Sequence, residues 1–184
     1  MVIIGIDVGI NGAAAALCPA DDEGPEFISD AIDLPTIPDG TKNQIDEIAL
    51  ARWLRLVGAT HAVIENVRAM PSIPGKDAVR RSMGSASAFR FGMAAGQIRA
   101  TCRVRGLEVS FVEPSVWKRW HGLAGPDKEN SRQLALQRWP LSAYLLRRKK
   151  DHQRAEAMLI AKWGVRPVIG RGLSDWTGWG RIPT

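Results

Sequence analysis

Three acidic side chains stand at points in the sequence where a carboxylate needs a chemical reason. Asp7 closes the apolar run MVIIGID, Glu65 closes the run THAVIE, and Glu156 directly precedes the apolar stretch 157–161. An unpaired charge costs free energy when it is buried beside apolar segments of this kind. Carboxylates gathered at one place also repel one another unless a cation lies between them. The pattern therefore indicates an oxygen-rich site for Mg²⁺ or Mn²⁺.

The residues just before Glu156 offer a fourth participant in such a site. His152 and Gln153 precede Glu156 by four and three residues, a spacing that places all three on one face of a helix. A histidine there can orient or deprotonate an attacking water, because its ordinary pKa is close to neutral. Asp151, a further candidate metal ligand, lies off that face in a regular helix and is equally suited to capping it. The sequence leaves open which of Asp151, His152 and Gln153 completes the site.

The elements that must position these side chains can be predicted from the hydrophobic pattern. Apolar, β-branched runs predict strands, whereas apolar residues three and four positions apart predict helices. Glycine and proline mark the ends of several segments. In the first half of the chain the pattern predicts a β-hairpin over 2–18, a strand over 26–35, a helix over 43–57 and a strand over 60–65.

The second half of the chain combines helices with one further strand. A long loop rich in Gly, Pro, Ser and basic residues is predicted over 66–85, and loops of such length are usually functional. Phe89 and Phe91 are interpreted as core residues of the helix that follows. The pattern predicts helices over 86–105, from Pro114 onward, over 128–139 and over 151–164, closed by Gly164, and a strand over 107–113. This order predicts an α/β fold, in which a mixed sheet opens as a meander and helices pack on its faces.

The charge is unevenly divided along the chain. The 184 residues suffice for one α/β domain, and 24% of them are charged, as in ordinary globular proteins. Residues 1–79 carry a net charge of −7 and residues 80–184 a net charge of +13, which together give the formal +6. A basic half of this size, beside a chemical site, is typical of proteins that bind nucleic acid.

Several other classes lack support in the sequence. The chain has no apolar run long enough to span a membrane and no signal-peptide pattern at its N-terminus. Cys18 and Cys102 provide neither a zinc-binding CxxC nor a disulfide framework. We therefore expect a cytoplasmic protein without a membrane partner or a zinc site.

Three motifs contain the acids: GIDVG with Asp7, VIEN with Glu65 and RAEAMLIA with Glu156. In order, spacing and surroundings they resemble the motifs of the RuvC-type Holliday junction resolvases, which are members of the RNase H-like superfamily. The resemblance covers roughly residues 1–165 and leaves 166–184 as a C-terminal tail rich in Trp, Gly and Arg. It implies an RNase H-like fold with a mixed five-stranded sheet. It also implies a homodimer whose acids bind Mg²⁺ and activate water to cut a phosphodiester. Two ions, Mg²⁺ or Mn²⁺, would stabilise the attacking and the leaving oxygen.

Basic side chains are expected to hold the DNA. Lys118 in VWKRW and Lys128 in GPDKENS occupy positions that resemble the family's phosphate-binding lysines. Lys76, Arg80 and Arg81 lie in the long loop, where they would track a strand near the branch point. The resemblance thus implies an endonuclease that binds branched DNA and resolves four-way junctions through paired nicks.

The sequence departs from the family at two places. Three residues before its last acid the family usually has an acid or a histidine, whereas this chain has Gln153. After the central acid the family has an aromatic wedge, whereas this chain has NVRAMP. Another RNase H-like enzyme, such as a flap or single-strand nuclease or a transposase-type recombinase, shares every acid named above and remains the alternative.

Two further readings explain less of the sequence. GIDVG also opens actin-like ATPases and sugar kinases, but these need a second lobe and a second phosphate turn, so no nucleotide cofactor is expected. A DNA-binding module without catalysis would not need three acids at matching positions.

Overall fold

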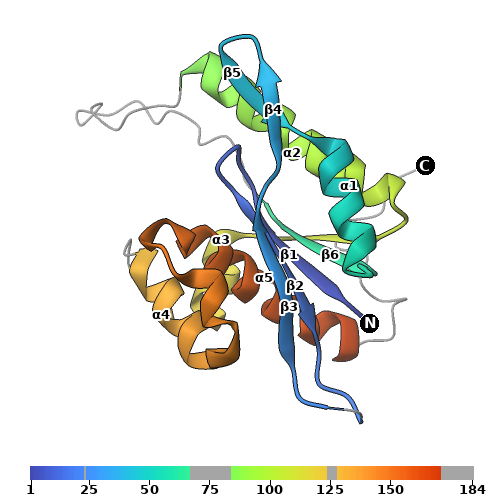
Figure 1. Ribbon diagram of the computed structural model, residues 1–184, viewed down its shortest axis with the longest axis vertical. Helices are drawn as coiled ribbons and strands as arrows, with labels where there is room; N and C mark the ends of the chain where they lie inside the picture. The colour runs from blue at the N-terminus through green and yellow to red at the C-terminus, as the bar shows by residue number, and fades with distance from the viewer. Residues whose placement is uncertain (23, 67–83, 124–127, 171–184) are drawn as a thin grey trace, which may run out of the picture.

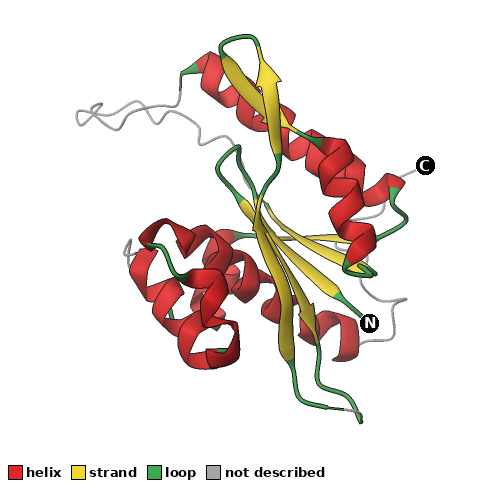
Figure 2. Ribbon diagram, viewed as in Figure 1, coloured by secondary structure: helices red, strands yellow, loops and turns green. Residues whose placement is uncertain are grey.

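A five-stranded mixed sheet forms the centre of the molecule (Figures 1 and 2). The computed structural model describes residues 1–22, 24–66, 84–123 and 128–170. The strands lie in the order β3 (Phe27–Asp33), β2 (Ala13–Cys18), β1 (Ile3–Asp7), β6 (His61–Glu65) and β7 (Glu108–Val112). β1, β2 and β3 form an antiparallel meander, whereas β1, β6 and β7 run parallel. The predicted α/β class with a mixed five-stranded sheet is confirmed.

Helices cover both faces of this sheet (Figure 1). One face carries α1 (Glu47–Leu56) and α2 (Ser85–Val104), and the other carries α3 (Pro114–Trp120), α4 (Lys128–Arg138) and α5 (His152–Gly170). Two 3-10 turns, η1 (Pro140–Leu146) and η2 (Lys149–Asp151), lead from α4 to α5. Ile4 packs with Leu50 and Ile98 in the first layer, while Ile3 and Val63 pack with α5 in the second. The central strands are apolar throughout because both of their faces are buried.

Helix α5 lies unusually close to the sheet because two glycines leave it room. A Cβ atom added at Gly5 of β1 would lie 2.1 Å from the Ala157 carbonyl oxygen. A Cβ atom added at Gly164 of α5 would lie 2.3 Å from Cγ2 of Val63 on β6. Real side chains do not tolerate such distances, so α5 can occupy this position only with glycine at both places. The position of α5 is therefore fixed by backbone contact with β1 and by close packing against Val63 of β6.

The helix predicted over 43–57 was wrong at its start. Residues 36–45 instead form a second hairpin of β4 (Thr36–Asp39) and β5 (Lys42–Ile45), with Gly40 at a φ of 61° in its turn. The helix begins only at Glu47, because the Asp46 side chain accepts a hydrogen bond from the Ala49 N–H at 2.9 Å and caps it.

Two further sequence interpretations were also wrong. Gly164 was expected to end the last helix, but α5 continues to Gly170 and crosses the predicted division at residues 165/166. Phe91 packs against the core as expected, but Phe89 is 69% exposed. Most of the predicted loop 66–85 lies outside the described residues, and in the described part no helix is long and apolar enough to cross a membrane.

Candidate active site

Two of the three acids meet at the carboxyl ends of neighbouring parallel strands. Asp7 is the last residue of β1 and Glu65 the last residue of β6, and Ile6 pairs with Ile64 in the register between the strands. Both carboxylates are buried. The turn after β1 folds tightly over this end, since a Cβ atom at Gly12 would lie 2.2 Å from the Asp7 carbonyl oxygen. The sequence-based pairing of these two acids is therefore matched by their positions.

Helix α5 brings the third acid to the same region. Glu156 is buried, and its Oε1 lies 3.1 Å from Nζ of Lys118 on α3. The same oxygen accepts a hydrogen bond from the Ser131 hydroxyl of α4 at 3.3 Å. Three helices thus contribute to the surroundings of one carboxylate.

Electrostatics show that the acids affect one another. Burial raises the pKa of Glu65 above its ordinary value. Glu65 accepts a hydrogen bond from the indole N–H of Trp117 at 3.0 Å, and this hydrogen bond opposes the shift. The negative charge of Glu156 raises the pKa of Glu65 further, whereas Lys118 and a hydrogen bond with Asp7 lower it. The net shift is upward, chiefly because Glu65 is buried, and the charge of Glu156 adds to it.

The chemistry of these donors fits a hard divalent cation. Each acid offers carboxylate oxygens, which Mg²⁺ and Mn²⁺ prefer, and a cation would relieve the repulsion between Glu65 and Glu156. Within the described ranges, no group of three acidic, histidine or cysteine side chains has an arrangement that could hold a metal ion as it stands. The Lys118 ammonium instead provides positive charge beside Glu156.

Asp151 and His152 lie in contrasting surroundings at the start of α5. Asp151 is buried, and it accepts hydrogen bonds from the backbone N–H of Arg148 at 2.7 Å and from the Arg148 Nε at 2.8 Å. Burial alone would raise the pKa of Asp151, but Arg148 lowers it below its ordinary value. His152 lies one turn before Glu156, and its buried Nε2 has no hydrogen-bond partner among the described residues. Asp151 thus serves the turn before α5, whereas His152 retains an unused ring nitrogen.

The basic residues assigned to DNA are only partly described. Lys118 lies at the acids, with its side chain about one third exposed (36%). Lys128 is the first residue of α4, and its side chain lies outside the described part. Lys76, Arg80 and Arg81 also fall outside the described residues.

Sequence reasoning missed two residues that contact the acids. Trp117 donates to Glu65 across 52 positions of the chain, and Ser131 donates to Glu156 across 25. No local spacing indicates either contact, because both depend on how α3 and α4 pack against the sheet. The only available signal was the position of Trp117 next to Lys118.

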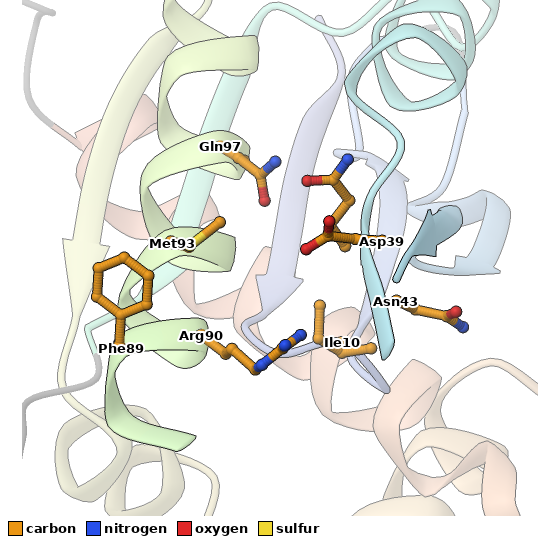
Figure 3. A pocket seen from close by; sticks show the side chains of 8 residues that line it. Ile10, Asp39, Asn43, Phe89, Arg90, Met93 and Gln97 are labelled. Carbon is orange, nitrogen blue, oxygen red and sulfur yellow. The ribbon is translucent and has the colours of Figure 1, made fainter. Parts of the chain in front are cut away.

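A cavity of about 100 Å³ lies between α2 and the β4–β5 hairpin, beside the turn that follows β1 (Figure 3). Ile10, Asp39, Arg90 and Met93 are among the residues that line it. None of the three acids does so. The candidate active site is therefore the group of acids at the strand ends and not this cavity.

His121, which follows α3, is held in its neutral form. Burial is the main cause that lowers the pKa of His121 from 6.5 to about 4. The hydrogen bond to the Leu159 carbonyl raises this pKa, whereas the positive charges of Arg138 and Lys162 lower it further. Between these two values the unfolded chain binds the proton and the folded chain does not, so stability falls as the pH falls. We expect the free energy of unfolding to drop by roughly 2 kcal/mol across this range, less than the whole shift gives, because the ring is only partly buried.

Urea denaturation followed by circular dichroism at several pH values from neutral to about 4 measures this loss. His121→Gln retains a nitrogen donor for the Leu159 carbonyl but does not titrate, so its stability should depend less on pH in this range. His61→Gln, on β6, is the matched control. An equal pH dependence in wild type and His121→Gln would assign the acid sensitivity to other groups.

Comparison with solved structures identifies the fold. The structure of T. thermophilus RuvC in complex with Holliday junction substrate has a TM-score of 0.63 and 15% identity, covering 91% of this chain and 97% of that chain. A second Thermus thermophilus RuvC structure has a TM-score of 0.60 and 12% identity, covering 91% of this chain and 96% of that chain. The structure of the fowlpox virus Holliday junction resolvase has a TM-score of 0.55 and 15% identity, covering 92% of this chain and 99% of that chain. The expected RuvC-type, RNase H-like fold is confirmed.

No family model and no curated protein matches the sequence. At identities of 12–15% the structural likeness shows the fold alone.

Proposed function

We propose that the chain is a metal-dependent, structure-selective endonuclease that resolves Holliday junctions or other branched DNA by paired nicking. The observation that carries the proposal is the convergence of Asp7, Glu65 and Glu156 at one end of the sheet. The fold adds weight, because it is shared with resolvases, one of them in complex with a Holliday junction substrate. Both cysteines are free, which suits the reducing cytoplasm.

In this proposal Asp7, Glu65 and Glu156 would hold two divalent metal ions, either Mg²⁺ or Mn²⁺. When bound, such ions stabilise charge on the attacking and leaving oxygens of a phosphodiester. The chain's own residues prepare the site: Trp117 and Ser131 hold two of the carboxylates through hydrogen bonds. Lys118 neutralises Glu156 until DNA arrives, and a phosphate can then compete for its ammonium group.

His152 is proposed as the fourth catalytic residue in preference to Asp151. The Arg148 guanidinium and backbone N–H already bind both carboxylate oxygens of Asp151. Within the described ranges the buried Nε2 of His152 has no hydrogen-bond partner, and His152 is one helical turn from Glu156. There its ring can accept a proton from an attacking water.

A pair of variants tests this choice. His152→Gln should lower the cleavage rate by about a hundredfold or more, because a positioned general base contributes on that scale. Asp151→Asn should leave cleavage within a few-fold of wild type and lower the free energy of unfolding by about 1–2 kcal/mol, through loss of a cap and a partly exposed ion pair. Single-turnover cleavage and urea denaturation measure the two effects. Loss of cleavage without loss of stability in Asp151→Asn would make Asp151 a metal ligand after all.

DNA binding is proposed to involve the basic half of the chain, including Lys118, Lys128, Lys76, Arg80 and Arg81. Several phosphate contacts would make the affinity fall steeply with salt. Paired nicking of two strands also needs two active sites, so we propose a homodimer. Sedimentation velocity should then give a species with twice the chain mass of 20.1 kDa.

The substrate itself is tested with a panel of labelled DNAs of matched sequence: a four-way junction, a Y-fork, a flap, a duplex and a single strand. With Mg²⁺ or Mn²⁺ the junction should be nicked on two opposing strands and the other DNAs more slowly, and chelation should stop all cleavage. Equal cutting of every DNA would exclude resolvase selectivity. Preferred cutting of the flap or single strand would favour another RNase H-like nuclease, and no cutting with either metal would contradict the proposal.

A further inference from the structure

Trp117 makes a contact that ordinary core packing does not require. Its side chain is fully buried, and its indole N–H donates to Oε1 of Glu65 at 3.0 Å. A buried indole N–H needs an acceptor, but a carboxylate at the candidate active site is an unusual one. A hydrogen bond to a charged acceptor is stronger than a neutral one. Trp117 therefore restrains the orientation of the Glu65 carboxylate.

The indole ring is itself held in place from the helix that carries Glu156. His121 meets the Trp117 ring edge-on, with 6.3 Å between the ring centroids. Its Nε2 donates to the carbonyl of Leu159 on α5 at 2.8 Å, and the low pKa of His121 keeps the ring neutral. Contacts thus run from β6 through α3 to α5, and so from one acid to the helix of another.

The same ring also supports a cation. Nζ of Lys118 lies 5.1 Å from the centroid of the Trp117 ring, within the range of a cation–π interaction, while it pairs with Glu156. One buried side chain therefore contacts both an acid of the candidate site and the lysine that neutralises a second acid. A residue that served only the core would make neither contact.

We propose that Trp117 is a positioning residue, whose indole N–H holds the Glu65 carboxylate in the orientation that binds the divalent cation and whose ring supports Lys118. This inference rests on the proposed function. Partners that orient a metal ligand from behind typically contribute about tenfold to a hundredfold in metal affinity. Trp117 should contribute on that scale, although it does not touch the metal or the DNA.

The decisive measurement is Mn²⁺ affinity, obtained from the electron paramagnetic resonance signal of the free ion. Trp117→Phe keeps an aromatic ring and removes the N–H, and it should weaken Mn²⁺ binding by about tenfold or more. Trp139→Phe is the matched control: Trp139 is buried in the same hydrophobic cluster but belongs to the segment after α4. The Mn²⁺ affinity of Trp139→Phe should stay within about twofold of wild type, and this control should bind junction DNA without metal as wild type does.

Loss of packing is separated from loss of the hydrogen bond in two ways. Replacement of Trp117 by 3-benzothienylalanine keeps the two-ring shape and lacks the N–H, so it should weaken Mn²⁺ binding as much as Trp117→Phe even if the latter folds poorly. In a Glu65→Gln background, Trp117→Phe should change Mn²⁺ affinity by less than about twofold, because coupled residues are not additive.

Each outcome decides the proposal. If Trp117→Phe weakens Mn²⁺ binding no more than Trp139→Phe does, or if its effect persists in the Glu65→Gln background, Trp117 is a core residue and the inference is overturned. If wild type cuts junctions and the 3-benzothienylalanine variant binds Mn²⁺ normally, only this inference fails. If wild type neither binds Mn²⁺ nor cuts DNA, the proposed function fails with it.

Discussion

Asp7→Asn should reduce junction cleavage by about a thousandfold or more. Metal ions supply several kcal/mol of charge stabilisation in phosphodiester cleavage, and about 4 kcal/mol corresponds to roughly a thousandfold in rate. Asp7 ends β1 beside Glu65 of β6, so it stands where the proposed metal would be held. The amide is almost the same size as the carboxylate but has lost its negative charge. Single-turnover cleavage of a labelled four-way junction measures the effect.

The same variant should fold and bind DNA. Its free energy of unfolding should equal that of wild type or exceed it by up to about 1 kcal/mol, because the remaining acids lose a like-charged neighbour. The affinity of Asp7→Asn for the junction without divalent metal should be equal to that of wild type or higher. Asp22→Asn, at an exposed residue beyond the opposite end of β2, is the matched control and should cleave as wild type does. Undiminished cleavage by Asp7→Asn would overturn the assignment of the site.

Gly5→Ala should destabilise the protein by about 3 kcal/mol or more. The added methyl group would lie 2.1 Å from the Ala157 carbonyl oxygen and 2.3 Å from the Ala161 backbone nitrogen. Both are backbone atoms of α5, so the clash cannot be relieved by a side-chain rotation and the helix must move. Overpacking typically costs 1–3 kcal/mol and occasionally more, and here it strikes the centre of the fold. Urea denaturation followed by circular dichroism measures the loss.

Displacement of α5 would also carry Glu156 away from Glu65, so Gly5→Ala should lose cleavage even under conditions in which it remains folded. Gly92→Ala is the control. Gly92 lies in α2, and no described atom lies within 4 Å of a Cβ added there, so this change should stabilise the helix by about 0.5–1 kcal/mol. A Gly5→Ala variant as stable as wild type would contradict the close approach of α5 to β1.

The acids were predictable because local sequence carries their signal. Asp7 and Glu65 each follow a buried strand, and continuous apolar runs of this length are typical of strands covered on both faces. Glu156 directly precedes a fully buried stretch of α5. The proximity of Asp7 and Glu65 follows once the two strands are parallel neighbours, as they are, whereas that of Glu156 depends on the packing of α5.

The remaining features depend on tertiary contacts. The β4–β5 hairpin has mostly exposed residues, so its sequence lacks the alternation of apolar and polar residues that predicts strands. Gly164 resembles a helix stop in sequence, but the absent side chain serves packing against Val63. The roles of Trp117 and Arg148 likewise follow from partners: one bonds an acid 52 positions away, and the other also pairs with Asp33, 115 positions away.

The contact of α5 with β1 and β6 has a consequence for how such a chain can evolve. The spacing of the acids depends on the close approach of α5 at Gly5, where it meets backbone, and at Gly164, where the Val63 side chain fills the space that a Cβ atom would need. Substitutions on the surface and in the loops can therefore accumulate without shifting the distance between strand and helix. Maintenance of this geometry requires only a few small residues, which is compatible with a shared fold at 15% identity. The contact between α5 and the sheet therefore restricts sequence change at these two positions more than on the surface of the molecule.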